Sequence, residues 1–323
     1  MTSSTPRVAV IILNWNNADD TLACLRSVMA LDYPAEQMNV IVVDNGSTDD
    51  SVARILAAYP AITLLQNSAN LGYAEGNNVG IRYALRLRNE YILILNNDVE
   101  VWPNLLDRLV AEAMLDLSIG VVGPKMYFSD PSDMIFAAGS LVRWEEGAIE
   151  QRGIWQRESE VGPLFADEAE DVDFIVGCGV LFRSEVLEKL GGLEPRFYLN
   201  FEDIDICIRA RRAGYRIRYT PRTALYHKVS ATLGQGSPQN TYYMTRNALL
   251  FFGMHLSGWR RYRTLSRIVA RNLGHVVVWY LLPKYRNATR AKRLANLFAL
   301  RDAVLGRFGC MGEDVAAICR MQS

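Results

Sequence analysis

Short runs of Val, Ile and Leu recur along the first 125 residues, and each is followed by a polar turn and then by a helical pattern. The runs lie at residues 8–13, 40–43, 62–65 and 91–95, and a pair of valines at 121–122 continues the series. Strands that are apolar throughout are buried on both faces, and strands that alternate with helices indicate parallel βαβ units. The sequence therefore predicts an α/β protein with a doubly wound, mostly parallel sheet flanked by helices.

The pattern changes beyond the fifth run. Residues 125–170 mix aromatic, glycine and acidic residues without a clear period, which predicts a loop region or an insertion. Further on we expect a strand over residues 173–182 and helices over residues 184–190 and 203–213. From about Gln239 the chain is expected to be helical to its end.

Charge divides the chain into two parts. Residues 1–237 contain 21 Lys and Arg against 32 Asp and Glu, whereas residues 238–323 contain 14 against 3. The total is balanced at 35 against 35, which argues against a nucleic-acid partner, but the basic part is suited to a polyanionic surface. We therefore expect one domain over residues 1–237 and a basic helical region over residues 238–323.

The basic region contains an amphipathic helical pattern. Apolar side chains recur every three or four residues on one stripe, formed by Trp259, Tyr262, Leu265, Val269 and Leu273. Arginines lie largely on the other face (Arg260, Arg263, Arg267 and Arg271), and a second basic group follows (Lys284, Arg286, Arg290, Lys292 and Arg293). A basic helix that bears Trp and Tyr is typical of a segment that lies in the interface of an anionic bilayer. A helical cap or the contact of a homodimer is the alternative.

Targeting and membrane-spanning signals are weak. The longest apolar stretches, near residues 248–254 and 276–282, are shorter than the ~18–20 residues that cross a bilayer. The N-terminus does not have the pattern of a signal peptide, and the five cysteines form no CxxC pair. We therefore expect a cytoplasmic protein that is held peripherally on the inner face of the cell membrane by its basic region.

Clusters of Asn and Asp follow three of the apolar runs. They begin at Asn14, Asp44 and Asn96. Ligands of a doubly wound sheet bind outside the carboxyl ends of the strands, where these clusters are expected to lie. A single cluster of this kind is more often a structural turn, and that interpretation stays open for each. As ligand contacts, Asp44 can accept a ring N–H from a pyrimidine base, and Asp98 can bind Mg²⁺ or Mn²⁺.

Glycines recur every four residues at 72, 76 and 80, at the start of an expected helix. Two interpretations are open. The spacing allows the helix to pack closely on the sheet, or it leaves unhindered backbone N–H groups next to an anion.

Two carboxylates begin the helix expected over residues 203–213. Asp203 lies at the edge of the apolar face, whereas Asp205 points away and can pair with Arg209 four residues later. Asp203 is therefore the better candidate for a general base in a partly apolar cleft, and Asp205 is predicted to be structural.

His227 lies in the segment ALYHKVS, which follows the helix expected over residues 203–213. A lone histidine is usually an ordinary core or surface residue. It can instead complete a metal site or contact a diphosphate.

Six segments stand in a specific order and spacing: VIILNWN, VVDNGSTDDS, NLGYAEGNN, YILILNNDVEV, GGLEPRFYLNFEDIDICIRARRAGYRI and HKVS. Together they resemble the family 2 glycosyltransferases, and most strongly the rhamnosyltransferase-like subset that builds cell-surface polysaccharides. The resemblance covers about the first 230 residues. It implies a GT-A fold and an inverting, single-displacement transfer from a nucleotide-diphosphate sugar.

The resemblance also implies roles by position. Asn14 and Asp44 would lie at the base of the nucleotide, and Asp98 would be the metal carboxylate of a DxD-like motif. Asp203 would be the catalytic base, and His227 would bind the metal or the diphosphate. Further contacts are predicted with the nucleotide (Asn16, Asn45, Asn70, Gly72, Asn77 and Asn97) and with the acceptor (Glu202 and Tyr198). Asn96 departs from the family, because many members have Asp there.

These features predict an enzyme that moves rhamnose or a related hexose from a dTDP- or UDP-sugar to a lipid-linked or polysaccharide acceptor, with Mg²⁺ or Mn²⁺ as cofactor. A nucleotidyltransferase is an alternative, but it normally needs a Gly-rich, basic phosphate loop near the N-terminus, which residues 14–17 do not offer. A non-catalytic sugar-binding or assembly protein is another alternative. It predicts a broken base or metal motif, whereas Asp98 and Asp203 are both present.

Overall fold

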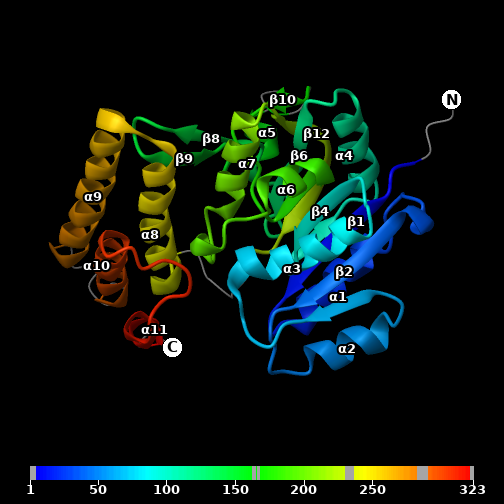
Figure 1. The fold of residues 1–323 in the computed structure, drawn as a ribbon, viewed down its shortest axis with the longest axis horizontal. Coiled ribbons are helices and arrows are strands. Elements are labelled where there is room, and N and C mark those ends of the chain that lie inside the picture. The colour runs from blue at the N-terminus through cyan, green and yellow to red at the C-terminus, as the bar shows by residue number, and fades with distance from the viewer. Residues whose placement is uncertain (1–4, 162–164, 166–167, 230–235, 282–289, 321–323) are drawn as a thin grey trace. The chain divides into compact units, whose positions relative to one another are not determined.

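The structure is a computed structural model that describes residues 5–161, 165, 168–229, 236–281 and 290–320 (Figure 1). Two of the predicted cations, Lys284 and Arg286, lie outside the described residues.

The chain forms two compact units. The first, called the sheet unit, comprises Met1–Leu141, Gln151–Glu194 and Asp203–Val229. The second, called the helical unit, comprises Val142–Glu150, Pro195–Glu202 and Ser230–Ser323. The helical unit therefore contains the basic region expected over residues 238–323 together with two short segments from the earlier part of the chain.

Ten strands among the described residues form the sheet of the first unit: β1 (Val8–Asn14), β2 (Met38–Asp44), β3 (Thr63–Gln66), β4 (Tyr91–Asn96), β5 (Val99–Val101), β6 (Ile119–Phe128), β7 (Ile135–Ala137), β10 (Glu170–Asp171), β11 (Gly179–Arg183) and β12 (Arg216–His227). Their order is β10-β12-β6-β11-β4-β1-β2-β3, with β5 beside β12 and β7 beside β6. The β1–β2, β1–β4, β2–β3 and β6–β12 pairs are parallel, whereas β11 is antiparallel to both neighbours. The predicted mostly parallel sheet is confirmed.

The central strands are buried on both faces, as their composition predicts. Residues 8–12 of β1 are completely inaccessible to solvent. Because successive side chains of a strand point to opposite faces, protein must cover both sides of the sheet. Helix α3 packs on β1 and β2, and α4 packs on β6 and β12 (Figure 1). The helices of this unit are α1 (Ala18–Val28), α2 (Ser51–Ala58), α3 (Gly72–Arg86), α4 (Leu105–Met114), α5 (Glu158–Val161), α6 (Ser184–Leu190) and α7 (Glu202–Arg212).

Two regions differ from the prediction. Residues 125–170 are not only loops, since β6 continues to Phe128 and the short strands β7, β8 (Ser140–Arg143) and β9 (Ala148–Gln151) follow. Strands of three or four residues are too short to show a period.

The strand expected over residues 173–182 is confined to β11, and β12 was not expected at all. Its sequence mixes arginines with apolar residues, and its pairing with β6 shifts register between Thr220 and Ala224, around Pro221.

The helical unit is built from α8 (Pro238–His255), α9 (Gly258–Leu281), α10 (Arg290–Val304) and α11 (Glu313–Arg320). Helices α8 and α10 pack together around Tyr242, Tyr243, Ala295 and Ala299, with Val315 of α11 added to the same cluster. None of the helices described here has an apolar stretch long enough to cross a bilayer.

Helix α9 buries a partly polar stripe made of Thr264, Ile268 and Asn272. The Asn272 side-chain oxygen accepts hydrogen bonds from Thr245 of α8 and Asn296 of α10, each at 3.1 Å. Amide and hydroxyl groups therefore fix α9 against its neighbours in the helical unit.

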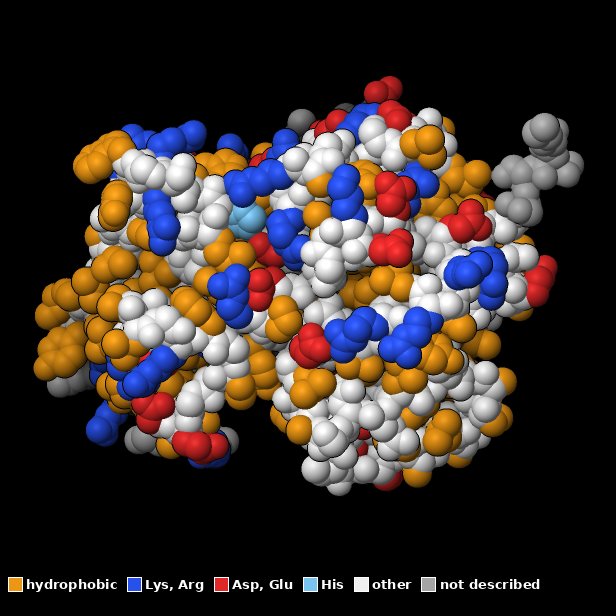
Figure 2. All heavy atoms as spheres, viewed as in Figure 1, with side chains coloured by type: hydrophobic (Ala, Val, Ile, Leu, Met, Phe, Trp, Pro, Cys, Tyr) orange, Lys and Arg blue, Asp and Glu red, His pale blue; other side chains and the backbone are white. Residues whose placement is uncertain are grey.

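The predicted apolar stripe of α9 lies away from this packed face. Trp259 and Tyr262 are 75% and 68% exposed, and Leu273 is exposed as well. Further hydrophobic side chains are exposed at the C-terminal end of α9, among them Val277 and Tyr280, and Figure 2 shows such side chains gathered there. An amphipathic helix is thus present, but its aromatic stripe faces solvent.

The arginines on the flank of α9 contact the turn between β8 and β9. Arg260 and Arg263 form ion pairs with Glu145, the former at 2.8 Å. Arg267 and Arg271 donate to backbone carbonyl oxygens of residues 145–147 at 2.5–3.1 Å. These four side chains therefore attach α9 to the β8–β9 turn within the helical unit.

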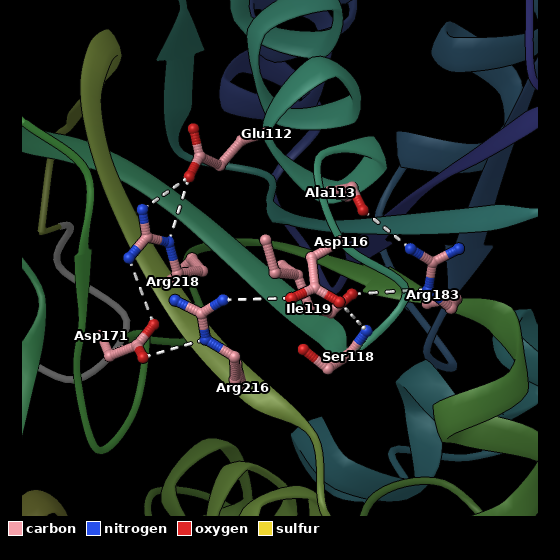
Figure 3. A network of polar contacts seen from close by, with 9 residues as sticks. All are labelled: Glu112, Ala113, Asp116, Ser118, Ile119, Asp171, Arg183, Arg216 and Arg218. Atoms are coloured by element: carbon pink, nitrogen blue, oxygen red, sulfur yellow. Dashed lines mark hydrogen bonds and ion pairs between the residues drawn. The ribbon is translucent and has the colours of Figure 1, made fainter.

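A network of ion pairs anchors the first residues of β12 in the sheet unit (Figure 3). Arg218 donates through Nε and Nη2 to Glu112 of α4, each at 3.0 Å, and it also lies 3.3 Å from Asp171. Glu112 is only 3% exposed, so its charge depends on Arg218. Arg216 pairs with Asp116 and Asp171, but all three of these side chains are well exposed.

We expect Arg218→Ala to lower the free energy of unfolding by about 3 kcal/mol, because removing one partner of a buried ion pair leaves an uncompensated charge. Urea denaturation followed by circular dichroism measures this loss. Arg216→Ala is the control and should change stability little, because exposed ion pairs are weak. Equal losses in the two variants would contradict the assignment of Arg218 as the anchor.

Candidate active site

Three parallel strands of the sheet unit end at one edge. Asn14 of β1 lies opposite Asp44 of β2, and Leu13 lies opposite Asn96 of β4. The polar turns that follow these strands are therefore neighbours, at the carboxyl edge where such sheets bind ligands.

A chain of hydrogen bonds joins these turns. Asn14 Nδ2 donates to Asp44 Oδ1 at 2.8 Å, and Thr21 Oγ1 donates to Asn14 Oδ1 at 2.7 Å. Asn97 Nδ2 in turn donates to Thr21 Oγ1 at 3.0 Å. The second oxygen of Asp44 accepts from the backbone N–H of Ser47 at 3.0 Å. Asn14 is completely buried and Asp44 is 2% exposed, so these two residues form the floor of the edge.

Asn45 holds the next turn in place. Its Nδ2 donates to Asn70 Oδ1 at 3.0 Å and to the carbonyl of Gly72 at 3.1 Å. Its Oδ1 accepts from Asn67 Nδ2 at 3.0 Å and from the Leu71 N–H at 3.1 Å. This buried amide therefore uses its own donors and acceptor to fix the turn that precedes α3.

The predicted nucleotide contacts differ in their accessibility. Asn16 is exposed, and its Oδ1 accepts from the Thr48 N–H at 2.7 Å. Asn70 and Asn97 are partly exposed. Asn77, in contrast, is completely buried, and its Nδ2 donates to the carbonyl of Tyr73 at 2.9 Å. Asn16, Asn70 and Asn97 are therefore the accessible side chains among these amides, while Asn77 supports α3 from within.

The glycine row of α3 packs on the sheet. A Cβ at Gly76 would lie 2.8 Å from Leu13, and one at Gly80 would lie 2.7 Å from Ile11. Gly72 starts the helix with a φ of 80°, and its N–H donates to Asn70 Oδ1 at 2.8 Å. Close packing thus explains Gly76 and Gly80, whereas Gly72 provides the left-handed backbone of the turn.

Asp98 and His227 meet at the same edge. Strand β5 pairs with the end of β12, which places His227 opposite Val99. Asp98 Oδ1 lies 3.2 Å from His227 Nε2, and Asn96 Nδ2 lies 3.5 Å from the same nitrogen. Burial lowers the pKa of His227, but Cys178 and Asp98 beside it outweigh this effect and raise the pKa to about 10.

These residues fit a divalent cation. The side-chain oxygen of Asn96 is buried without a hydrogen-bond partner in the described part of the chain, and so is Nδ1 of His227. A carboxylate and an amide oxygen are suitable donors for Mg²⁺ and Mn²⁺, and the imidazole of His227 becomes a donor for Mn²⁺ once it has released its proton, because metal ligands must be deprotonated. Among the described residues no group of three or more His, Cys, Asp or Glu side chains is arranged to hold a metal. A cation at Asp98 would therefore take further ligands from a bound diphosphate.

Asp203 lies at the start of α7 with both oxygens fixed. Its Oδ2 accepts from the Gly177 N–H at 2.8 Å, and its Oδ1 accepts from the Ile204 N–H at 2.8 Å. The hydroxyl of Tyr73 donates to the Gly177 carbonyl at 2.7 Å, so α3 and the Gly177 turn are linked. Loss of hydration raises the pKa of Asp203, and the backbone N–H groups oppose this rise.

Gly177 and Thr21 were not singled out from the sequence. Gly177 lies in a Gly-Cys-Gly sequence that was expected to be strand, and a Cβ there would lie 3.2 Å from Asp203 Cβ. The two closely spaced glycines were the available signal of a turn. Nothing in the sequence around Thr21 marks it, because its hydroxyl joins the turn at residues 14–17 to Asn97, which is distant in the sequence.

Asp205 is structural, as predicted. It is completely buried, and its carboxylate accepts from Arg209 Nε at 2.7 Å. Arg209 also donates to the carbonyls of Leu190 and Gly192, each at 2.8 Å. This pair therefore ties α7 to the turn after α6.

The two predicted acceptor residues belong to the segment that leads into α7. Glu202 is buried. The ring of Tyr198 stacks on Tyr243 of α8, with the ring centroids 5.4 Å apart. Tyr198 is thus partly covered by the helical unit of which it is a part, and its contact with an acceptor stays a prediction.

Comparisons with known proteins extend this picture. The sequence model of the family described as "Glycosyltransferase like family 2" matches residues 6–241. N-acetylglucosaminyl-diphospho-decaprenol L-rhamnosyltransferase of Mycobacterium tuberculosis (strain ATCC 25618 / H37Rv) is 25% identical over 277 residues, which cover 81% of this chain and 88% of that protein. O-antigen biosynthesis protein RfbC of Myxococcus xanthus is 27% identical over an alignment of 344 positions, which covers 92% of this chain and 26% of that protein.

Solved structures share the fold. The mannosyltransferase PcManGT from Pyrobaculum calidifontis, in complex with GDP-Man and Mn²⁺, matches with a TM-score of 0.59 and 18% identity over 94% of this chain and 89% of that one. S. aureus TarS 1–349 in complex with UDP-GlcNAc also matches with a TM-score of 0.59 and 18% identity, over 97% of this chain and 83% of that one. The expected GT-A-type fold is confirmed.

We predict that the carboxyl group of Asp203 titrates above the ordinary aspartate value of 3.8. Burial disfavours the charged form, so the group keeps its proton to a higher pH than an exposed aspartate does. A pH titration of side-chain carboxyl carbons by nuclear magnetic resonance measures the midpoint, and the Asp203→Asn variant assigns the signal. A midpoint at or below 3.8 would contradict the prediction.

Proposed function

This chain belongs to the family 2 glycosyltransferases, and from that premise we propose that it moves one rhamnose or related hexose from a dTDP- or UDP-sugar to a lipid-linked or polysaccharide acceptor in cell-surface glycan synthesis. The observation that carries the proposal is the pairing of Asp98 with His227 at the same sheet edge that holds Asp44. Family membership favours this function over a nucleotidyltransferase or a non-catalytic sugar-binding protein. The Mycobacterium tuberculosis relative, an L-rhamnosyltransferase by name, supports rhamnose and a lipid-diphosphate acceptor.

We propose that the base of the donor binds at Asp44. Uracil and thymine share an N3–H donor, and each oxygen of Asp44 accepts one hydrogen bond from the protein, which leaves lone-pair capacity for a further donor. Because Asn14 and Ser47 hold the carboxylate, little conformational freedom is lost when the base binds. Asn16, Asn70 and Asn97 are the accessible amides for the rest of the nucleoside.

Asp98 and His227 would hold a divalent cation, with Asn96 beside them. The cation would supply positive charge for the diphosphate as its negative charge grows during bond cleavage. The side chain of Asn96 contributes an amide oxygen without adding a negative charge. The protein's own task here is to keep the carboxylate and the imidazole 3.2 Å apart at the sheet edge.

Asp203 is the proposed catalytic base. The acceptor hydroxyl gives its proton to Asp203 while its oxygen bonds to the anomeric carbon of the sugar. The bond between that carbon and the diphosphate oxygen breaks in the same step, and its electron pair leaves with the nucleotide diphosphate. The configuration inverts because the attack is on the opposite face. The raised pKa of Asp203 makes it a stronger base than an exposed aspartate.

The exposed stripe of α9 is proposed to lie on an anionic membrane, where it brings the enzyme to a lipid-linked acceptor at the inner face. Trp and Tyr are favoured at bilayer interfaces, and Trp259 and Tyr262 are exposed on the same helix. At the other end of α9 an apolar groove of about 440 Å³ is lined by Val276, Val277, Tyr280, Leu281, Leu294 and Leu297 together with Arg290 and Arg293. Each arginine near an anionic surface adds about 1 kcal/mol.

The function is tested by incubating the protein with dTDP-, UDP- and GDP-sugars, a polyprenyl-diphosphate-linked sugar and Mn²⁺. Release of nucleotide diphosphate and glycosylation of the lipid are both measured. We expect transfer from a pyrimidine donor, and Asp203→Asn should lower its rate by about 10²–10⁴-fold. Binding of the nucleotide, measured by calorimetry, should be retained in this variant because the base acts on the acceptor.

Asp107→Asn, an exposed carboxylate on α4, is the control and should keep the wild-type rate. A chelator should stop transfer, and Asp98→Ala should raise the Mn²⁺ concentration that restores it. Preference for GDP-sugars would refute the role of Asp44. Full transfer in excess chelator would refute the metal site, and full transfer by Asp203→Asn would refute the base.

We also expect the protein to sediment with vesicles that contain phosphatidylglycerol, and high salt should release it. Trp259→Ser combined with Tyr262→Ser should weaken sedimentation, because both side chains are lost from the stripe. Arg260 and Arg263 are unsuitable test positions, since they hold the β8–β9 turn. Leu117→Ser, at an 81% exposed position of the sheet unit, is the control. Equal binding to neutral vesicles would contradict the proposal, and a dimer that dissociates in the double variant would assign the stripe to a homodimer contact.

A further inference from the structure

The loop that precedes α7 has an unusual backbone. Tyr198, Asn200 and Phe201 have φ values of 63°, 66° and 77°. Residues other than glycine rarely adopt this left-handed region, and Tyr and Phe do not have the short polar side chain with which Asn can stabilise it. Such a backbone persists only where its surroundings hold it. The loop runs directly into Glu202 and Asp203.

Asn247 of α8 holds this loop by its carbonyls. Its Nδ2 lies 2.8 Å from the oxygen of Phe197, 2.8 Å from that of Leu199 and 2.9 Å from that of Asn200. Asn247 is completely buried. One amide group therefore fixes the loop at three of its carbonyl oxygens.

Arg246 adds a second set of contacts. Its Nη2 lies 3.2 Å from the Phe197 oxygen and 3.5 Å from the Arg196 oxygen. Its Nε donates to Asn247 Oδ1 at 3.1 Å, which orients the Asn247 amide with its NH₂ group toward the loop. The orientation of Asn247 thus depends on its neighbour in the sequence.

The guanidinium of Arg246 is itself fixed inside the helical unit. It is completely buried, its Nη1 donates to the Gly309 carbonyl at 2.8 Å, and it lies 4.9 Å from the ring centroid of Tyr243. The Tyr242 hydroxyl connects it to the buried Asp302, 2.8 Å from that hydroxyl. Apolar side chains can often replace a buried charge without loss of stability. We therefore attribute the choice of arginine at position 246 to its hydrogen bonds with backbone oxygens, and not to filling of the core.

We propose that Arg246 and Asn247 are positioning residues for the transfer step, because they hold the left-handed loop at residues 197–201, which is followed directly in the chain by Glu202 and Asp203. The proposal rests on the role of Asp203 under "Proposed function". The match to the family model ends at residue 241, before both residues.

The donor and acceptor steps should respond differently to this contact. The turns proposed to bind the nucleotide are fixed by Asn14, Asn45 and Thr21 within the sheet unit. Their hydrogen bonds involve neither Arg246 nor Asn247. A change at Asn247 should therefore lower the rate of transfer and leave binding of the nucleotide diphosphate unchanged.

The test compares Asn247→Asp and Arg246→Lys with the wild-type protein. The Asn247→Asp change keeps the shape of the side chain but replaces its NH₂ donor with an oxygen, which repels the three carbonyl oxygens of the loop. The Arg246→Lys change keeps the charge but loses the planar guanidinium group. We expect kcat for transfer to fall about 10²-fold in Asn247→Asp, since misplacement of a reacting group by about 1 Å has such an effect. Arg246→Lys should fall less. Dissociation constants for the nucleotide diphosphate should stay within twofold of the wild-type value.

Asn272→Ala is the matched control, because Asn272 is also buried in the helical unit but contacts Thr245 and Asn296 instead of the loop. It should lower the melting temperature and keep the wild-type kcat at temperatures where it is folded. If Asn247→Asp keeps its kcat, or loses it only in proportion to unfolding as measured for the control, the proposal is wrong. If the wild-type protein transfers no sugar, or Asp203→Asn is fully active, the proposed function fails instead.

Discussion

The pairing of β1 between β2 and β4 is the constraint on which the active-site edge depends. A slip of one residue in either pairing would turn the buried residues 8–12 to the other face and move Asn14 away from Asp44. Burial on both faces disfavours such a slip, because every side chain of the strand is packed against neighbours on its own face of the sheet. The positions of the polar turns thus follow from the packing of residues that have no chemical role.

Two kinds of polar residue share this edge. Asn14, Asn45 and Asn77 are buried amides that hold neighbouring turns or α3 together. Asp98 and Asp203 carry the charges suited to chemistry. The amides form the rigid support that a preorganised site requires, since reacting groups are effective only when other residues fix their geometry. The Asn-rich motifs therefore contain supporting amides as well as accessible ones.

Much of the sheet could be predicted from the sequence, because buried parallel strands have a local signature. Strand β12 could not, since arginines interrupt its apolar residues, and the partner of Arg218, Glu112, lies on α4. At the site, the carboxylates Asp98 and Asp203 stood out through their motifs, and Asp205 was correctly assigned to Arg209 from helical spacing alone. The contacts of Gly177 and Thr21 depend on distant turns. Arg246 resembles a surface arginine in the sequence, and only the fold shows that it is buried.

The assembly of the helical unit from separate segments has a consequence for biosynthesis. Phe197 leaves the ribosome 49 residues before Arg246, its partner in the folded protein. At typical elongation rates this interval lasts about 2–10 s, and domains fold as units while synthesis continues. The strands that form the nucleotide edge are complete in the nascent chain before the loop at residues 197–201 has its support. In a newly made chain, the turns that carry the proposed nucleotide contacts can thus be in place before the loop that leads to Asp203 is supported.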